Sequence, residues 1–149
     1  GELGYISWRH SELYREEYGF GDTFEFYLIE GMYKFLNECQ GKGEVWVLDY
    51  FGQVVGSIAI VETDPDTAQL RWFLIEPEFR GMGLGKKLME TGLAYCRDLK
   101  YQKVFLWTVK DLDAARHLYE KFDFSITETK EHFLWEKNIV EERWDLVLS

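Results

Sequence analysis

The spacing of apolar residues gives a weak strand signal and two helix signals over the first forty positions. Residues Gly4–Trp8 alternate weakly, which predicts a short opening strand. A helix is predicted over His10–Tyr18, with Gly19 as its C-cap. From Asp22 onward, apolar residues recur every three or four positions, the pattern of an amphipathic helix that ends before Gly41. Its apolar positions are Phe24, Tyr27, Leu28, Met32, Phe35, Leu36 and Cys39.

Three strand signals follow, over Val45–Tyr50, Val54–Val61 and Ala68–Ile75. The connections between them are short and rich in turn-forming residues, so we expect antiparallel hairpins. Pro77 closes the third strand, and a glycine-spaced segment leads into a helix over about Leu84–Leu99. The middle of the chain therefore predicts a three-stranded meander followed by a helix.

The last third of the chain alternates between strand and helix signals. Val104–Val109 predicts a buried strand and Asp113–Phe122 a short helix, and closing strands are expected over Phe124–Thr129 and Trp144–Leu148. Lys130–Asn138 is predicted to be a polar and aromatic connection. The order of elements indicates a mixed α+β domain, in which a ligand enters beyond the carboxyl ends of the strands around the strand-to-helix crossover.

Composition indicates a single domain over residues 1–149. The chain is 46% hydrophobic and 17% aromatic, enough to bury a sizeable core. Its formal net charge is −10, and no run of Lys and Arg forms the basic stripe that nucleic acids require, so direct nucleic-acid contact is not expected. Cys39 and Cys96 lack disulfide or metal-site spacing, and no apolar stretch is long enough for a bilayer span, so we expect a cytoplasmic protein without membrane contact.

The strongest chemical signal is the segment Arg80-Gly81-Met82-Gly83-Leu84-Gly85-Lys86. Its glycines let backbone N–H groups approach an anion closely, and the start of the following helix adds partial positive charge. A P-loop needs a Gly-Lys pair followed by Ser or Thr, and a dinucleotide fingerprint needs its third glycine one place later. Neither pattern fits, so a different phosphate site or a ligand-free glycine turn remains.

The run from Phe73 to Lys86 resembles the acetyl-CoA motif of GNAT-superfamily N-acetyltransferases, in which a Gln or Arg, two residues, Gly, one residue and Gly or Ala follow in order. Arg80, Gly83 and Gly85 occupy those places. The resemblance implies the GNAT (acyl-CoA N-acyltransferase) fold, a mostly antiparallel mixed sheet of six to seven strands flanked by about four helices. It also implies transfer of acetyl from acetyl-CoA to a primary amine by direct attack in a ternary complex, without a metal.

The same resemblance assigns roles to individual residues. Leu74 and Ile75 would present backbone groups to the thioester carbonyl, where donors stabilise a developing oxyanion. Tyr119 is the expected general acid for the departing thiolate, its alternative role being that of a core aromatic. The residues expected to hold the cofactor are Phe73, Leu74, Ile75, Arg80, Gly81, Met82, Gly83, Leu84, Gly85 and Lys86.

Two positions depart from the family pattern. The Asn often found seven residues before the tyrosine is Leu112, and the usual Gly before the last Phe is Asp123, which tolerates a left-handed turn. Substrate walls are expected from Tyr18–Phe24 and Lys130–Asn138. The general base is left open, with an ordered water as one alternative. The residues that qualify by type are Glu62, Glu76, His10, His117 and His132.

Within the family, several segments are similar to the acetyltransferase half of MarR–GNAT fusion proteins, which would imply a winged-helix domain attached upstream. These segments are Arg9–Tyr14, Glu16–Gly19, Asp64–Arg71 and Ala114–Tyr119. The acceptor, on a small molecule or a protein, and a homodimeric state stay open. The alternative function is an acyl-CoA-binding sensor or regulatory module without robust catalysis.

Overall fold

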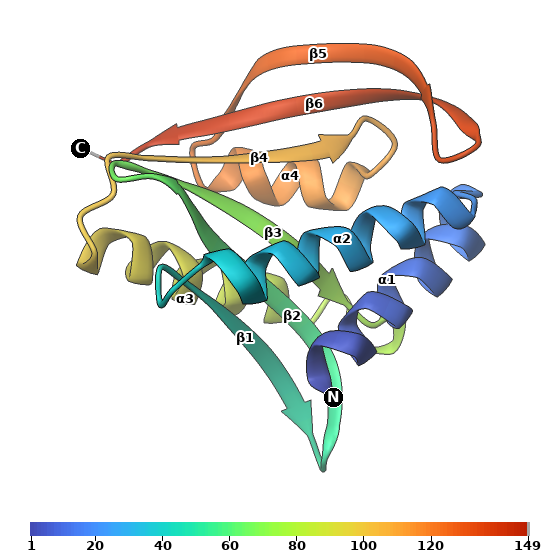
Figure 1. Ribbon diagram of the computed structural model, residues 1–149, viewed down its shortest axis with the longest axis horizontal. Coiled ribbons are helices and arrows are strands. Elements are labelled where there is room, and N and C mark those ends of the chain that lie inside the picture. Colours follow the sequence, from blue (N-terminus) through green and yellow to red (C-terminus); the bar gives the residue numbers. More distant parts are fainter. Residues whose placement is uncertain (149) are drawn as a thin grey trace.

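A computed structural model describes residues 1–148. In this part of the chain, six strands form one sheet in the order β1-β2-β3-β4-β6-β5, and four α-helices and one 3₁₀ turn flank it (Figure 1). The elements are α1 (Glu2–Tyr18), α2 (Asp22–Glu38), β1 (Gly43–Tyr50), β2 (Gln53–Asp64), β3 (Thr67–Ile75), η1 (Pro77–Phe79), α3 (Leu84–Asp98), β4 (Lys103–Val109), α4 (Asp113–Lys121), β5 (Ser125–Leu134) and β6 (Lys137–Val147).

The sheet consists of two antiparallel halves that meet at a short parallel pair. β1, β2 and β3 form one half, and β4, β6 and β5 form the other. β3 and β4 are joined by the crossover through α3, and they pair only from Thr67↔Lys103 to Gln69↔Phe105. Beyond these residues the two strands diverge toward their carboxyl ends (Figure 1). Such a gap is the usual ligand entrance of an open sheet with parallel strands.

Helices cover both faces of the sheet, α1 and α2 on one and α3 and α4 on the other (Figure 1). Burial of apolar side chains between each layer and the sheet is the main stabilising contribution. The core under α3 and α4 includes Ile58, Ile60, Leu88, Met89, Leu93 and Leu106. The core under α1 and α2 includes Ile6, Phe20, Phe24, Leu28, Trp72 and Trp135.

The opening strand predicted over Gly4–Trp8 is wrong, because these residues lie inside α1. Ile6 and His10 are both buried, one helical turn apart. Packing of that face against the sheet outweighs the weak alternation of a five-residue segment. The helix predicted over His10–Tyr18 is the second half of α1, and it ends as predicted at Gly19, which has φ 73°.

The connection predicted over Lys130–Asn138 is also wrong, because β5 and β6 run through it and meet at the turn Trp135-Glu136. The φ angles of these two residues are 54° and 65°, as in a two-residue type I′ hairpin. β5 is an edge strand exposed along nearly its whole length. An edge strand without a buried face carries no apolar alternation, so its sequence is typical of a loop.

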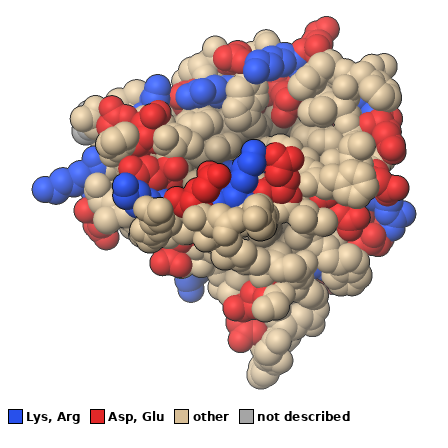
Figure 2. Space-filling model, in the orientation of Figure 1, with Lys and Arg blue, Asp and Glu red and all other residues tan. Residues whose placement is uncertain are grey.

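The other predicted elements are confirmed, with boundaries that agree within three residues except in the closing strands. β5 extends five residues past its predicted end at Thr129, and β6 begins seven residues before its predicted start at Trp144. They build the mixed α+β fold class predicted, with six strands in the described residues. Cys39 and Cys96 are free thiols. Among residues 1–148, none of the helices is both long enough and apolar enough to cross a bilayer. On the face shown in Figure 2, the described Lys and Arg side chains lie among acidic ones and form no continuous basic stripe.

Candidate active site

The loop between β3 and α3 leaves a row of backbone amides free. Gly81 and Gly83 both have φ 79°, a conformation that costs residues with a Cβ about 1 kcal/mol or more. Within residues 1–148, none of the six amides from Gly81 to Lys86 donates to a backbone carbonyl, and the first bond of α3 runs from Lys87 to Gly83 at 3.1 Å. No side chain caps this helix in the described chain. Free N–H groups at a helix N-terminus are suited to bind phosphate.

The loop borders a cavity of about 660 Å³, a size typical of cofactor sites. Nine of the ten residues predicted to hold the cofactor line this cavity, and the tenth, Met82, has an exposed side chain. The remaining walls come from α1, η1, the segment before α4, and α4 itself. They are formed by Tyr14, Tyr18, Phe79, Leu112, Ala114, Ala115, Leu118, Lys121 and Phe122.

Arg80 is held by an acidic partner on α1. Its two terminal nitrogens donate to the two carboxylate oxygens of Glu17 at 2.8 and 2.9 Å, and its Nε donates to the Ile75 carbonyl at 3.1 Å. The hydrogen bonds and charge of Arg80 lower the pKa of Glu17, so both groups are charged at neutral pH. Lys86 is exposed and only loosely paired with Glu90, at 3.9 Å. The amides and Lys86 are therefore the groups that remain available to an anion.

A bulge in β3 reshapes the strand beside the gap. Trp72 has φ 47°, and the register between β2 and β3 shifts between Ser57 and Ala59. The buried Ser57 hydroxyl donates to the Trp72 carbonyl at 2.7 Å and so fixes the bulge. Bulges re-aim the residues that follow them, here the last three of β3.

The register decides which peptide groups of β3 face the gap. Glu76 donates its N–H to the Val55 carbonyl of β2 at 2.9 Å. Peptide groups alternate sides along a strand, so those of Leu74 also point toward β2, and those of Phe73 and Ile75 point toward the gap. Of the two backbone positions expected near a thioester, Ile75 has the required direction, whereas Leu74 contributes its side chain to the cavity wall.

Tyr119 lies on α4 with only 5% of its surface exposed. Its ring packs near those of Phe73, Phe124 and Trp144. Burial raises the pKa of its hydroxyl above the ordinary value, so the phenol is protonated at neutral pH. Among residues 1–148, no side chain or carbonyl forms a hydrogen bond with this hydroxyl, which leaves its proton available.

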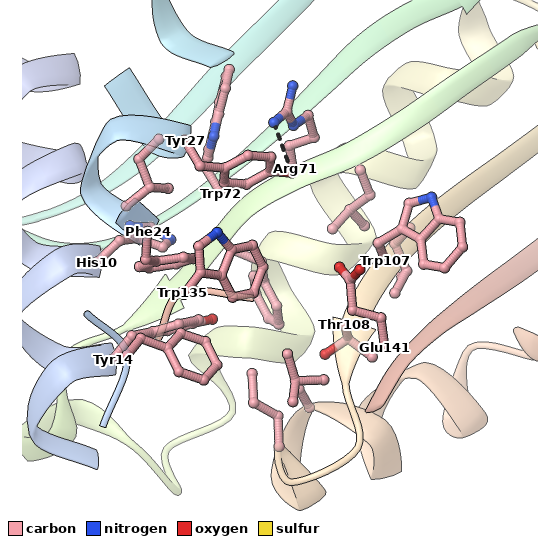
Figure 3. A pocket seen from close by; sticks show the side chains of 18 of the residues that line it. His10, Tyr14, Phe24, Tyr27, Arg71, Trp72, Trp107, Thr108, Trp135 and Glu141 are labelled. Atoms are coloured by element: carbon pink, nitrogen blue, oxygen red, sulfur yellow. Dashed lines mark hydrogen bonds between the residues drawn. The ribbon is translucent and has the colours of Figure 1, made fainter. Parts of the chain in front are cut away.

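A second cavity of about 120 Å³ lies on the α1 and α2 side of the gap. It shares Tyr14, Phe73, Leu112 and Ala115 with the larger cavity, so the two adjoin where β3 and β4 diverge. Tyr119 lines the smaller one. Figure 3 shows its walls, with aromatic side chains from α1, α2 and the β5–β6 turn facing side chains of β4 and β6.

The two segments predicted to form substrate walls contribute in part. Phe20, Phe24 and Trp135 line the smaller cavity, and their rings pack on one another with centroids 4.8 to 5.2 Å apart. Phe133 and His132 do not line it, and Phe133 is exposed. Tyr14 was missed by sequence reasoning, although it lines both cavities and burial raises its pKa.

Three of the five candidate bases lie away from the smaller cavity. Glu76 pairs with Arg9 at 2.7 Å, and Glu62 accepts a hydrogen bond from Tyr101 at 3.1 Å. His117 is exposed on α4. These residues are therefore poorly placed to accept a proton from an amine in the gap.

His132 lies next to the cavity through a residue that sequence reasoning missed. Its Nε2 is 2.7 Å from a carboxylate oxygen of Glu141 on β6, and Glu141 lines the smaller cavity. The Glu141 carboxylate points toward the middle of this cavity (Figure 3). Glu141 pairs with Val109 at the end of β4, level with the gap. Because β6 was predicted to begin at Trp144, the inward position of Glu141 could not be recognised.

His10 also lines the smaller cavity, and it is neutral. Its Nδ1 lies 2.8 Å from the Ile6 carbonyl, which requires the proton on Nδ1 and leaves a lone pair on Nε2. Within the described chain, the buried Nε2 has no hydrogen-bond partner. Burial lowers the pKa of this ring to about 4, against smaller opposing effects of the Ile6 carbonyl and the Glu76 carboxylate. His10 is thus a hydrogen-bond acceptor at neutral pH.

Comparison with known proteins adds relatives that are similar in sequence. The chain is 33% identical over 82 residues to an uncharacterized N-acetyltransferase, YjgM, of Escherichia coli, covering 53% of this chain and 49% of that protein. It is 31% identical over 83 residues to an amino-acid acetyltransferase of Mycobacterium tuberculosis, covering 54% and 48%. The chain thus spans about half the length of these relatives.

Solved structures share the fold. Ard1 from Thermoplasma volcanium superposes with a TM-score of 0.68 at 25% identity, covering 82% of this chain and 78% of that one. A GNAT family acetyltransferase from Elizabethkingia anophelis, solved with acetyl-CoA bound, gives a TM-score of 0.64 at 17% identity, covering 77% and 82%. The profile of the Acetyltransferase (GNAT) family matches residues 8–124, which include the free-amide loop, both β3 and β4, and Tyr119. The chain therefore belongs to the GNAT acetyltransferase family.

Proposed function

We propose that this chain transfers the acetyl group of acetyl-CoA to a primary amine by direct attack in a ternary complex. The observation that carries the proposal is the junction of two cavities at one gap. The larger cavity has six free amides at its rim and the dimensions of a cofactor site, and the smaller one opens on the other face of the sheet. Two reactants that enter from opposite faces meet between β3 and β4.

The residues of the larger cavity fit coenzyme A. The amides from Gly81 to Lys86 would hold the pyrophosphate, and the apolar side chains of Leu74, Leu118 and Phe122 would line the pantetheine arm. Acetyl-CoA supplies an activated acyl thioester when bound. The N–H of Ile75 would then stabilise negative charge on the carbonyl oxygen, as donors in an oxyanion hole do.

Two side chains of the smaller cavity would move the protons. Tyr119 holds a proton that it would donate to the departing sulfur, since its phenol is protonated and has no partner in the described chain. Glu141 would accept the proton of the attacking amine, directly or through one water. Its bond to His132 at 2.7 Å would orient the carboxylate. This assignment replaces the open choice among Glu62, Glu76, His10, His117 and His132.

The alternative is a sensor that binds acyl-CoA without robust catalysis. The two readings differ at the smaller cavity, which a sensor does not need. The names of the relatives above describe acetyltransferases, one of them of amino acids, and favour the enzyme. None of those names refers to a fused DNA-binding domain, so the finer similarity to MarR–GNAT fusion proteins stays a prediction.

The test is release of free coenzyme A thiol from acetyl-CoA with a panel of primary amines, run beside thermal denaturation with and without acetyl-CoA. We expect a raised melting temperature, because a ligand that binds only the folded state stabilises it, and amine-dependent thiol release. Stabilisation without turnover for any amine would favour the sensor. If acetyl-CoA neither raised the melting temperature nor released thiol, both the enzyme and the sensor hypotheses would be overturned.

Replacing Gly83 by Ala should weaken acetyl-CoA binding about tenfold. The added Cβ disfavours the left-handed turn at the start of α3 and rotates the neighbouring amides away from the phosphates. Isothermal titration with acetyl-CoA measures the change in Kd.

Gly52→Ala is the matched control for Gly83→Ala. Gly52 has φ 86° in the exposed β1–β2 turn, and a Cβ at either glycine would meet no atom within 4 Å. The control therefore introduces the same backbone strain away from the cavity and should leave Kd unchanged. Equal weakening in both variants would show general destabilisation and would contradict a phosphate role for the loop.

A further inference from the structure

Arg71 of β3 lines the smaller cavity, where its side chain contacts two aromatic residues. Its guanidinium lies over the rings of Trp72 and Tyr27, with 4.8 and 5.7 Å to the ring centroids, and donates to the Tyr27 hydroxyl at 3.3 Å (Figure 3). A Cβ at Gly31 would lie 2.8 Å from one guanidinium nitrogen, so the glycine of α2 makes room for this side chain. A stacked guanidinium with a fixed direction is preorganised to bind an anion.

The cation of Arg71 has no acidic partner in the described chain. Five of the seven arginines form ion pairs, although acidic residues outnumber basic ones by 27 to 17. Of the two arginines left within residues 1–148, Arg97 lies on α3 and lines neither cavity, whereas Arg71 borders the proposed acceptor site. Among the residues described, Arg71 is therefore an unpaired cation at the edge of the proposed acceptor site.

The opposite charge in this cavity is Glu141, and the strand register places the two at different heights. Glu141 pairs with Val109, and Gln69 is the last residue of β3 that pairs with β4, opposite Phe105. Arg71 therefore lies two residues beyond the last pair of β3 and β4, about level with Trp107. Glu141 lies two residues further toward the carboxyl ends of β3 and β4. Two residues of strand correspond to about 7 Å. The cavity is thus positive at one end and negative at the end near the gap.

From this arrangement we infer that the acceptor is a small amino acid whose carboxylate is separated from its reactive amine by several bonds. Arg71 would bind the carboxylate through its guanidinium, while Glu141 would receive the amine at the gap. A cavity of about 120 Å³ suits a molecule of this size, since cavities of about 150 Å³ hold a benzene molecule. The inference rests on the proposed function, because it names the substrate class of that same site.

The test compares 4-aminobutyrate with n-butylamine, which has the same number of carbons and lacks the carboxylate. We expect wild-type kcat/KM to be about tenfold or more higher for 4-aminobutyrate, as a charge-assisted hydrogen bond provides. Arg71→Gln should remove that preference by lowering kcat/KM for 4-aminobutyrate only. Equal use of the two amines by the wild type would overturn the inference.

Arg143→Gln is the matched control. Arg143 also lies over an aromatic ring, 4.0 Å from the centroid of Phe105, but it is paired with Asp145 at 2.9 Å and lines neither cavity. The Arg143→Gln variant should keep the wild-type preference for 4-aminobutyrate over n-butylamine. If Arg71→Gln lowers kcat/KM for both amines equally, Arg71 supports the structure only and the inference fails.

Binding separates failure of this inference from failure of the proposed function. Isothermal titration of 4-aminobutyrate into the protein saturated with coenzyme A measures the Kd of this amine without any acetyl transfer. Binding that Arg71→Gln weakens about tenfold would sustain the carboxylate subsite even if no amine were acetylated. Absence of binding, together with turnover of other amines, would overturn the inference and leave the acetyltransferase function standing.

Discussion

Replacing Tyr119 by Phe should lower kcat about 100-fold while leaving the Kd of acetyl-CoA unchanged. The change removes one oxygen from a buried ring and keeps the packing against Phe73 and Trp144. Loss of a general acid typically costs at least this factor, because the thiolate must then leave without a proton. Thiol release under saturating substrates measures kcat, and isothermal titration measures Kd.

Two further tyrosines make this prediction specific. Tyr101→Phe removes a hydroxyl that donates to Glu62, on a buried tyrosine that lines neither cavity, and it should leave kcat unchanged. Tyr14→Phe removes the hydroxyl of the tyrosine that lines both cavities. A large loss of kcat in Tyr14→Phe, with none in Tyr119→Phe, would transfer the general acid role to Tyr14.

The buried His10 should make the protein less stable in mild acid. Its pKa in the folded protein is about 4, below the ordinary 6.5. Between these values the unfolded chain binds a proton that the folded protein does not, so stability falls as pH decreases from 6.5 to 4 and is constant on this account above 6.5. Over the whole window this loss of stability amounts to about 3 kcal/mol.

Urea denaturation at pH 7.5 and pH 4.5 measures the effect as a difference in the free energy of unfolding. In His10→Gln the difference between the two pH values should be smaller than in the wild type by most of that amount. His117→Gln, which alters an exposed histidine on α4, should retain the full difference. An unchanged difference in His10→Gln would mean that His10 titrates normally in the folded protein.

The elements that the sequence predicts well are those with one strongly apolar face. α2 and the β1–β3 meander have such faces, and their boundaries agree with the structure. The first half of α1 does not, because only Ile6 of its apolar side chains is deeply buried there while Trp8 is half exposed. The extent of β5 was predicted poorly for a similar reason, because an exposed edge strand has no alternation of apolar and polar residues.

The candidate site divides in the same way. The phosphate loop follows from local sequence, because glycine spacing at a helix start has a direct backbone meaning. Arg71 and Glu141 lie 70 positions apart and come together only through the order of β3, β4 and β6. Their charges give no local pattern. The part of the site that selects an acceptor could therefore be found only in three dimensions.

The short parallel pairing of β3 and β4 has a mechanical meaning for the whole molecule. Within the sheet, the two three-stranded halves pair with each other through only three residue pairs of β3 and β4. A molecule bound between the diverging ends of β3 and β4 would contact both strands where they no longer pair, and would so connect the two halves. Buried apolar side chains of both halves already share common cores, and a bound molecule would add to these contacts. A compound that touches a small fraction of the surface would therefore stabilise both halves at once.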